Sequence, residues 1–508
     1  MRRTFLLAAL GAASLLSWAQ TRPAAAPVKK PKLVVMIVVD QFRYDYLTKF
    51  GSQFTGGFRR LLDHGAVFTN AYYDHMPTVT AVGHSIVLSG AMPASSGIVG
   101  NEWYDRQTGQ QVTSVSDEKV QQLGAPAKRG ASPHRLLVST VGDELKMSGK
   151  APSKVVSLSI KDRSAIMPGG HMADGAYWFD KPTGNFVSST WYFPDLPAWV
   201  KTFNEKKVID QWKGTLGYDK MSESKLGNDV VELFAETAIE GENLGRGEGT
   251  DLLSMSFSAN DTVGHAKGPD SPEAKEITLH TDKVLDRFFT FLDKRVGLSN
   301  VVVALSADHG VSPLPELMAT RKMPGGRIPE NVVLDAVTAA LNAKYGESKW
   351  VLGKSGPSPY LDHKLIADSK PGSRGSGTGG RTGGPQSSAH RPRVHTRGAA
   401  PRTFAERHGR RARPEWLLLP ASVGSGDRAG TLLAIRESGT SHGYALELPM
   451  PTCPSIFMGP GIKAGKYNGR ACVNDIAPTL TTMLEVETPS GSAGRVSHGD
   501  VGQVDGKR

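Results

Sequence analysis

The sequence predicts an α/β fold in which a central, mostly parallel β-sheet is flanked by helices. The apolar runs over residues 33–39 and 301–305 are typical of strands that are buried on both faces, and residues 252–257 are expected to form another strand. Segments with helical spacing of apolar residues separate these runs, and such alternation favours a parallel sheet. A chain of 508 residues is long enough for one large domain of this kind that carries an inserted subdomain.

The first 19 residues are organised like a secretory signal peptide. Arg2 and Arg3 precede an apolar run over residues 5–16, and small residues follow it. The run is short for a membrane span, although an uncleaved anchor is the alternative, and no later stretch is long enough to span a bilayer. We therefore expect an exported protein, periplasmic or extracellular, without membrane contact after cleavage. A Pro/Ala/Lys linker is expected over residues 20–32.

Cysteine content and charge limit the classes of function. Cys453 and Cys472 are the only cysteines, so they can form one bridge at most, and a metal site must use imidazole and carboxylate groups. The formal net charge of +11 suggests a nucleic-acid partner at first. Residues 371–415 account for +8 of it, with ten Arg and two acids. Because the basicity is local, we expect no nucleic-acid partner.

The first strand, over residues 33–39, ends in Asp40. Ligands of open α/β sheets bind at the carboxyl ends of the strands, so a carboxylate at this place is suited to chemistry. Capping of the next helix is the alternative role for such an aspartate. A helix over residues 46–64 and a short strand over residues 66–73 are expected to follow.

The stretch around Thr80 predicts the N-terminus of a helix. Pro77 and Thr78 end an extended approach, and the apolar spacing of residues 82–88 fits a buried helix. A helix N-terminus attracts anions, and together with a metal it would lower the pKa of the Thr80 hydroxyl and make it a usable nucleophile. A simple N-cap threonine is the alternative.

Two cations follow the strand that is expected over residues 155–160. Lys161 and Arg163 suit a polyanionic ligand, because Arg can hold two oxygens at once. An ordinary charged turn is the alternative. The earlier segment with Trp103 and Tyr104 is polar and aromatic, and we expect it to form a loop at the rim of a site.

The parallel pattern is then interrupted and resumes. Residues 169–249 are rich in aromatic and turn residues with weak periodicity, which predicts an inserted cap over the sheet. The strand over residues 252–257 precedes Asp261 and His265, and a helix is expected over residues 277–296.

More carboxylate and imidazole groups come later in the chain. The strand over residues 301–305 leads to Asp308 and His309, and His442 follows a late loop. A last strand and a last helix are expected over residues 454–458 and 474–484.

Residues 371–430 differ from the rest of the chain. They are rich in Gly, Arg, Pro and Ser, contain no Lys, and lack hydrophobic periodicity over most of their length. A disordered linker and a shifted reading frame in GC-rich DNA both explain this composition. The expected organisation is a signal peptide (1–19), a linker (20–32), a catalytic domain in three parts (33–168, 250–370 and 431–495), the cap (169–249), the anomalous segment (371–430) and a tail (496–508).

The residues that follow these strands form one set of metal ligands. Asp40, Asp261 and Asp308, with three histidines, supply the oxygen and nitrogen ligands that zinc accepts, enough for two ions. Two divalent ions can clamp the attacking and leaving oxygens of a displacement at phosphorus. Each residue alone has an ordinary structural explanation, whereas the joint pattern indicates a metal centre.

The same residues carry a resemblance to a known family. Asp40 after its strand and the motifs PTVTAVGH, GNEWYD, SIKDRS, ANDTVGH, SADHG and GTSHG occur in the order seen in the two-zinc alkaline phosphatase superfamily. Within it, the chain resembles the bacterial secreted alkaline phosphatases with a threonine nucleophile, which are related to type I phosphodiesterases and nucleotide pyrophosphatases. The resemblance covers residues 32–365 and 438–495 and implies an alkaline-phosphatase-like sheet. Residues 371–430 and the segment just after His442 depart from the family pattern.

The resemblance implies a role for each matched residue. One zinc ion would be held by Asp261, His265 and His442. The second would be held by Asp40, Asp308, His309 and the Thr80 oxygen. Asn101, Lys161 and Arg163 would bind the phosphoryl oxygens. The family mechanism is covalent: Thr80 attacks a phosphate monoester, and the resulting phosphothreonine is hydrolysed.

The residues themselves favour small phosphate monoesters as substrates. A monoester dianion has two charged oxygens beyond those bound by metal, and Lys161 with Arg163 offers donors for them. A phosphodiesterase or nucleotide pyrophosphatase of the same superfamily is the alternative. A catalytically inactive protein that binds anionic surfaces or nucleic acid through residues 371–430 is the alternative of another class. The sequence is compatible with a monomer and leaves the oligomeric state open.

Overall fold

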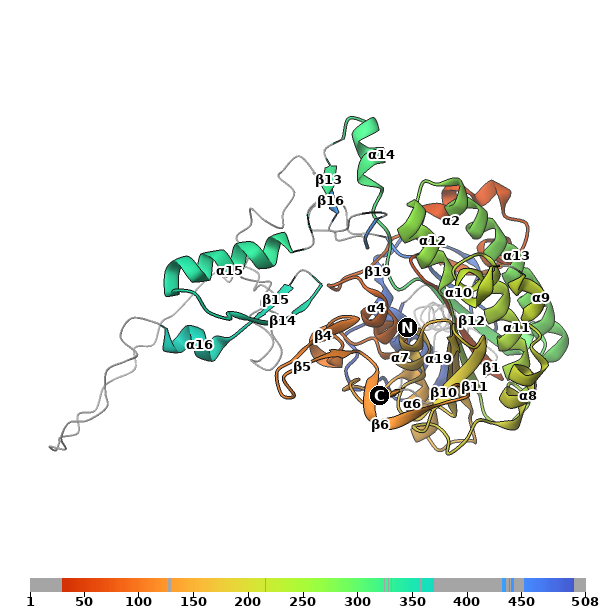
Figure 1. Cartoon of the computed structure of the whole chain (residues 1–508). Coiled ribbons are helices and arrows are strands. Elements are labelled where there is room, and N and C mark those ends of the chain that lie inside the picture. Colours follow the sequence, from red (N-terminus) through yellow and green to blue (C-terminus); the bar gives the residue numbers. More distant parts are fainter. Residues whose placement is uncertain are drawn as a thin grey trace, which may run out of the picture.

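The computed structural model describes residues 30–497, apart from 127–128, 215, 324, 328, 330, 357, 370–431, 435–437, 439 and 443–451. Within this part of the chain, eleven strands form one sheet with helices on both faces (Figure 1). The expected α/β fold is therefore confirmed. The segment expected to be a signal peptide, most of the expected linker, the anomalous segment and most of the tail lie outside the described residues.

The centre of the sheet is parallel. Strand β1 lies between β11 and β12 and runs parallel to both, β8 is parallel to β11, and β9 is parallel to β8. All their residues are buried, which explains why β1 is wholly apolar and β12 nearly so, while the serines that alternate with apolar residues in β11 and β8 are buried as well. In order across the sheet these strands are β12 (Val301–Ser306), β1 (Leu33–Val39), β11 (Asp251–Phe257), β8 (Val155–Ser159) and β9 (Gly175–Asp180).

The sheet is extended at both sides by strands that are paired mostly antiparallel, except that β18 runs parallel to β2. Strand β17 is antiparallel to β12 and to β2, while β10 is antiparallel to β9 and to β6. One side consists of β17 (Ser455–Met458), β2 (Ala66–Phe68) and β18 (Gly465–Tyr467), and the other of β10 (Asn185–Ser189), β6 (Ser116–Leu123) and β7 (Arg129–Ala131).

Two groups of helices cover the two faces (Figure 1). In the first group, helix α4 is buried along its whole length between the sheet and its neighbours, so its apolar residues are not confined to one side. This group consists of α4 (Thr80–Ser89), α6 (Val141–Met147), α7 (Asp162–Gly169) and α19 (Ile476–Leu484). The second consists of α3 (Gly57–His64), α11 (Leu226–Gly241), α12 (Ala259–Lys267) and α13 (Pro272–Arg295).

The structure corrects the expectation of an inserted cap over residues 169–249. These residues contain β9 and β10, which continue the central sheet, and helix α11, which packs on β8 and β11. Their aromatic side chains form core: the Phe186 and Phe234 rings stack at a centroid distance of 3.6 Å, and Phe203 packs on Phe234 at 5.0 Å. The aromatic composition therefore reflects burial, and the weak periodicity reflects strands that are covered on both faces.

Several elements lie outside the central sheet. Figure 1 shows α15, α16, β14 and β15 to one side of the molecule, where β14 lies against the hairpin β4–β5. Trp103 and Tyr104, expected in a rim loop, belong to β4 of that hairpin. The elements are β4 (Glu102–Asp105), β5 (Gln110–Thr113), α14 (Pro315–Thr320), β13 (Gly325–Arg327), α15 (Val332–Tyr345), β14 (Val351–Ser355), β15 (Ser358–Leu361), α16 (His363–Asp368) and β16 (Leu432–Ala434).

Two expected elements are broken by short turns. The helix expected over residues 46–64 is divided around Gly51 and Gly56, and the strand expected over residues 66–73 is divided in two. Glycine lowers helix stability, which accounts for the first break.

The remaining elements are α2 (Asp45–Lys49), η2 (Gly51–Gln53), β3 (Ala71–Tyr72), α5 (Pro93–Ser96), α8 (Ala198–Lys206), α9 (Asp210–Lys213), α10 (Gly217–Ser222), η3 (Leu298–Asn300), β19 (Ala471–Cys472) and η5 (Val473–Asp475).

Cys453 is buried and Cys472 is half-buried, and both are free thiols in the structure. Of the helices in the described part of the chain, none combines the length and the apolar character that crossing a bilayer requires.

Asp282 of α13 holds the N-terminus of α3 against the second helix layer. Its Oδ2 accepts hydrogen bonds from the backbone N–H groups of Thr55 (2.9 Å) and Gly56 (2.8 Å). Its Oδ1 accepts from Phe58 (2.7 Å) and Arg59 (3.3 Å). Because the residue before α3 is Gly56, which has no side chain to cap the helix, the carboxylate from α13 performs that role.

We expect Asp282→Ala to lower the free energy of unfolding by about 2–4 kcal/mol, because it leaves several buried amide groups without acceptors. Denaturant unfolding followed by circular dichroism measures this difference. Asp286→Ala on the same helix is the control, because Asp286 is 47% exposed and only pairs with Arg60 at 3.6 Å. Equal losses in the two variants would contradict the capping role.

Candidate active site

The predicted site residues meet at the carboxyl edge of the parallel strands. Asp40 directly follows β1, and Lys161 lies between β8 and α7. Asp308 and His309 follow β12. Because parallel strands present their carboxyl ends at one edge, residues from distant parts of the chain come within reach of one another.

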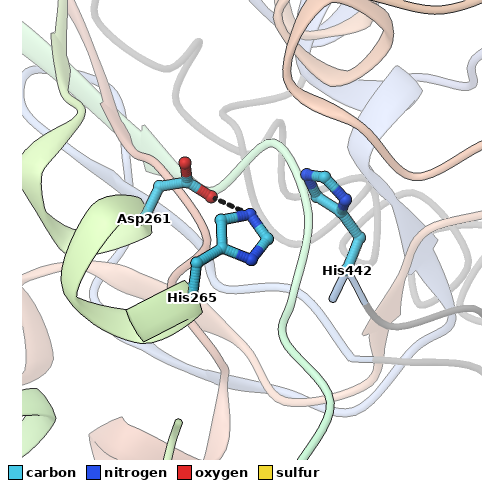
Figure 2. A group of neighbouring side chains, drawn as sticks. All are labelled: Asp261, His265 and His442. Atoms are coloured by element: carbon cyan, nitrogen blue, oxygen red, sulfur yellow. Dashed lines mark ion pairs between the residues drawn. The ribbon is translucent and has the colours of Figure 1, made fainter. Parts of the chain in front are cut away.

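Asp261, His265 and His442 form the first ligand group, and Figure 2 shows their arrangement. Asp261 and His265 lie on one face of α12, four residues apart, rather than at the strand end itself. His265 Nε2 is 3.0 Å from Asp261 Oδ1, and its Nδ1 is 2.7 Å from the carbonyl oxygen of Thr440. Donation from Nδ1 to that carbonyl directs the lone pair of Nε2 toward Asp261 and the site.

His442 faces this pair from a separate segment (Figure 2). Its ring centroid is 4.7 Å from that of His265 and 4.3 Å from that of His309. The backbone N–H of Ser312 donates to Ser441 O at 3.1 Å, and Val311 forms an isolated bridge with His442. These bonds attach the histidine to the segment that follows β12.

The second predicted ligand group surrounds His309. Its Nε2 is 3.4 Å from Asp40 Oδ1, 3.4 Å from Asp308 Oδ2 and 3.4 Å from Thr80 Oγ1. The Nδ1 atom is 3.0 Å from Gly310 O and donates to it, so Nε2 carries the lone pair. The second group adjoins the first, because His309 Nε2 is also 3.9 Å from Asp261 Oδ1.

Thr80 is the first residue of α4, and the preceding Val79 is extended. The threonine is 1% exposed. Asn101 Oδ1 accepts a hydrogen bond from the backbone N–H of Ala81 at 2.8 Å, which places Asn101 beside the helix N-terminus. The nucleophile candidate and a residue expected to bind phosphate therefore lie together.

Lys161 reaches the centre of the site. Its Nζ is 2.6 Å from Asp40 Oδ2, 2.6 Å from Asp261 Oδ2 and 3.5 Å from Thr80 Oγ1. Arg163 lies in the first turn of α7, where its Nη1 is 3.7 Å from Asp162 Oδ1. Its described contacts are therefore with Asp162 and not with the ligand groups.

Burial and the concentration of charge shift the pKa values of these groups. Burial raises the pKa of Asp40, and the Asp308 carboxylate adds to the rise. Burial opposes the charge on Lys161, but Asp261 and Asp40 outweigh it and raise the pKa of the ammonium group. Burial lowers the pKa of His309 and of His442, which keeps both imidazoles neutral and able to bind a metal.

The side chains present fit divalent cations. Asp40, Asp261 and Asp308 bring three carboxylates together against the single ammonium group of Lys161, which leaves negative charge uncompensated. Among the described residues, Asp40 Oδ1 is buried and has no hydrogen-bond partner. Neutral imidazole with carboxylate is the ligand set that zinc accepts.

Sequence reasoning missed two residues of this site, His84 and Gln41. His84 Nδ1 is 2.9 Å from Thr80 O and 3.0 Å from Asp308 Oδ2, while its Nε2 is 2.8 Å from Ser256 Oγ. It also forms a candidate metal group with Asp40 and Asp308. The available signal was a histidine four residues after Thr80 in a buried helix, where a polar side chain needs a partner.

Known proteins share this architecture. The family model for type I phosphodiesterase / nucleotide pyrophosphatase matches residues 34–371. Alkaline phosphatase PhoV of Synechococcus elongatus is 34% identical over 94% of this chain and 94% of its own length. Alkaline phosphatase PafA of Elizabethkingia meningoseptica is 34% identical over 92% of this chain and 94% of its own length.

A solved structure agrees with these sequence comparisons. The crystal structure of wild-type alkaline phosphatase PafA has a TM-score of 0.77 and 30% identity, covering 94% of this chain and 100% of that one. The chain therefore belongs to the type I phosphodiesterase / nucleotide pyrophosphatase family of the alkaline phosphatase superfamily, on the branch that contains the alkaline phosphatases PhoV and PafA.

Proposed function

We propose that this protein is a metal-dependent alkaline phosphatase that hydrolyses small phosphate monoesters with Thr80 as nucleophile. The observation that carries the proposal is the convergence of two Asp/His groups on one buried hydroxyl at a helix N-terminus. Homology to PhoV and PafA supports the reaction class.

Two zinc ions are the proposed cofactors. Asp261, His265 and His442 would hold one ion. Asp40, Asp308, His309 and the Thr80 oxygen would hold the other. When bound, the ions would lower the pKa of the nucleophile and neutralise negative charge on the leaving group.

The protein side chains position the reactants. The Thr80 oxygen forms a bond to phosphorus while the bond from phosphorus to the ester oxygen breaks, which gives phosphothreonine and an alcohol. Water then cleaves the phosphothreonine and releases phosphate. Lys161 lies 3.5 Å from the Thr80 hydroxyl and is placed to hold a non-bridging phosphoryl oxygen, and Asn101 is anchored beside it. We assign Arg163 to the same anion, on its position in the first turn of α7.

The location follows from residues 1–19, which read as a signal peptide. We infer export to the periplasm or the extracellular medium, and cell fractionation of the full-length protein tests this. Retention in the cytoplasm would contradict it.

The nucleophile is tested at Thr80. We expect Thr80→Val to lose activity by roughly 10³-fold or more and to form no acid-stable phosphoenzyme, because the side-chain volume is kept and only the hydroxyl is removed. Thr80→Ser keeps a hydroxyl and should retain both the intermediate and a measurable part of the activity. Acid quench with a ³²P-labelled monoester measures the intermediate. A labelled Thr80→Val protein would disprove the assignment.

Metal content tests the cofactor proposal. The purified wild-type protein should contain two zinc ions per chain, and a chelator should abolish turnover, because the nucleophile then loses its activation. His442→Ala should retain one ion, since it removes a ligand from one group alone. His64→Ala, at an exposed position at the end of α3, is the control and should retain both. Elemental analysis gives the stoichiometry, and equal zinc content in the two variants would contradict the ligand assignment.

The hydrolysis rates of a monoester and a diester distinguish a phosphomonoesterase from a phosphodiesterase, the activity for which the matching family is named. We expect 4-nitrophenyl phosphate to be hydrolysed with a much higher kcat/KM than its bis-ester, because Lys161 interacts best with the extra negative charge of the monoester. Lys161→Ala should therefore reduce the preference as well as the rate. A wild-type preference for the bis-ester would favour a phosphodiesterase.

A further inference from the structure

Gln41 combines two locally unfavourable features beside the metal-ligand groups. It is 2% exposed, and its φ of 66° lies in the left-handed region that non-glycine residues seldom adopt. Among the described residues, its Oε1 is buried without a hydrogen-bond partner. Strained and unsatisfied groups of this kind persist only when the surrounding structure requires them, and they cluster at functional sites.

The left-handed backbone directs one hydrogen bond to the second ligand group. The backbone N–H of Gln41 donates to Asp308 Oδ1 at 3.0 Å. The N–H of His309 donates to the same oxygen at 2.9 Å. These two bonds hold one oxygen of the Asp308 carboxylate and leave Oδ2 facing His309.

The Gln41 side chain makes the equivalent bond to the first ligand group. Its Nε2 donates to Asp261 Oδ1 at 2.6 Å, in a buried environment. The other side-chain atom, Oε1, lies against the backbone of α12 at Gly264, where an added Cβ atom would come within 1.9 Å of it. Gly264 therefore leaves the space that the Gln41 amide occupies.

We propose that Gln41 is a positioning residue that fixes one ligand from each metal group, Asp308 through its backbone and Asp261 through its side chain. The inference rests on the proposed function and goes beyond it, because it assigns the alignment of the two groups to a residue that binds neither ion. Glutamate here would place a like charge against Asp261, and asparagine would be one methylene shorter. Carboxylate ligands held by such outer hydrogen bonds typically lose 10–100-fold in metal affinity when the bond is removed.

Glycine substitution separates the two bonds. Gln41→Gly keeps the backbone N–H that binds Asp308 and accepts the left-handed conformation readily, but it removes the amide that binds Asp261. We expect the full-length protein, stripped of metal and titrated with zinc against a competing chelator, to bind one ion normally and the other roughly 10–100-fold more weakly. The melting temperature of the metal-free variant should not fall, because the left-handed strain is relieved.

A second variant disturbs the Gln41 side-chain amide through a change in α12. Gly264→Ala should displace the Gln41 side chain and weaken zinc binding in the same way, although alanine is normally the better helix residue. In Gln41→Gly/Gly264→Ala the added methyl group has no amide to displace. The two effects should therefore be strongly non-additive.

The affected ion is identified in a His442→Ala background. His442→Ala already weakens the group that contains Asp261, so adding Gln41→Gly should leave the affinity for the remaining ion unchanged. Asn243→Gly is the control for glycine at a left-handed position, with φ of 56°, and should bind zinc like the wild type.

The outcomes separate the inference from the proposed function. A wild-type protein that binds no zinc would overturn both. If the wild-type protein binds two ions and the Gln41→Gly variant binds each of them with wild-type affinity, the inference alone is overturned. It is also overturned if the variant binds both ions more weakly by the same factor. Loss of one ion with the other retained, reproduced by Gly264→Ala, is the expected result.

Discussion

The site depends on holding three buried carboxylates close together. Asp40, Asp261 and Asp308 repel one another where water does not screen their charge, and this repulsion would oppose folding without nearby positive charge. Lys161 bridges two of them, and the His309 imidazole, whose pKa is lowered by burial, lies against all three. The excess negative charge that opposes folding also attracts divalent cations to the site.

The parallel sheet makes this arrangement possible. Its central strands are buried on both faces, so their backbone positions are fixed by packing and by neighbouring strands. The candidate ligands Asp40 and Asp308, which follow β1 and β12, are held on this rigid framework. Helix α4, buried along its length, presents Thr80 at its first turn, and His84 links the same helix to Asp308. The proposed nucleophile, held in this way, would lose little entropy on reacting, which is how positioning lowers a barrier.

The candidate ligand His442 is held in place by its neighbours in the chain. The backbone N–H of Thr440 donates to His265 O, and the backbone N–H of Ser312 donates to Ser441 O. These bonds hold the short stretch of chain before His442 beside the first group. The imidazoles of His265 and His309 then pack around its ring. Backbone bonds of this kind orient a ligand without requiring a strand or helix around it.

The sequence alone determined the elements whose signal is local. Apolar runs marked the buried strands, and Asp40, Thr80, Asp308 and His309 were found because each stands next to such a run or at a helix start. The tertiary structure decided what depends on partners far along the chain. Residues 169–249 contribute β9 and β10 to the sheet, and strands covered on both faces lose the alternation that identifies them. The partners of Gln41 and His84 could not be assigned from sequence, although the buried helix signalled that His84 needs one, because folding alone brings Asp261 and Asp308 to these side chains.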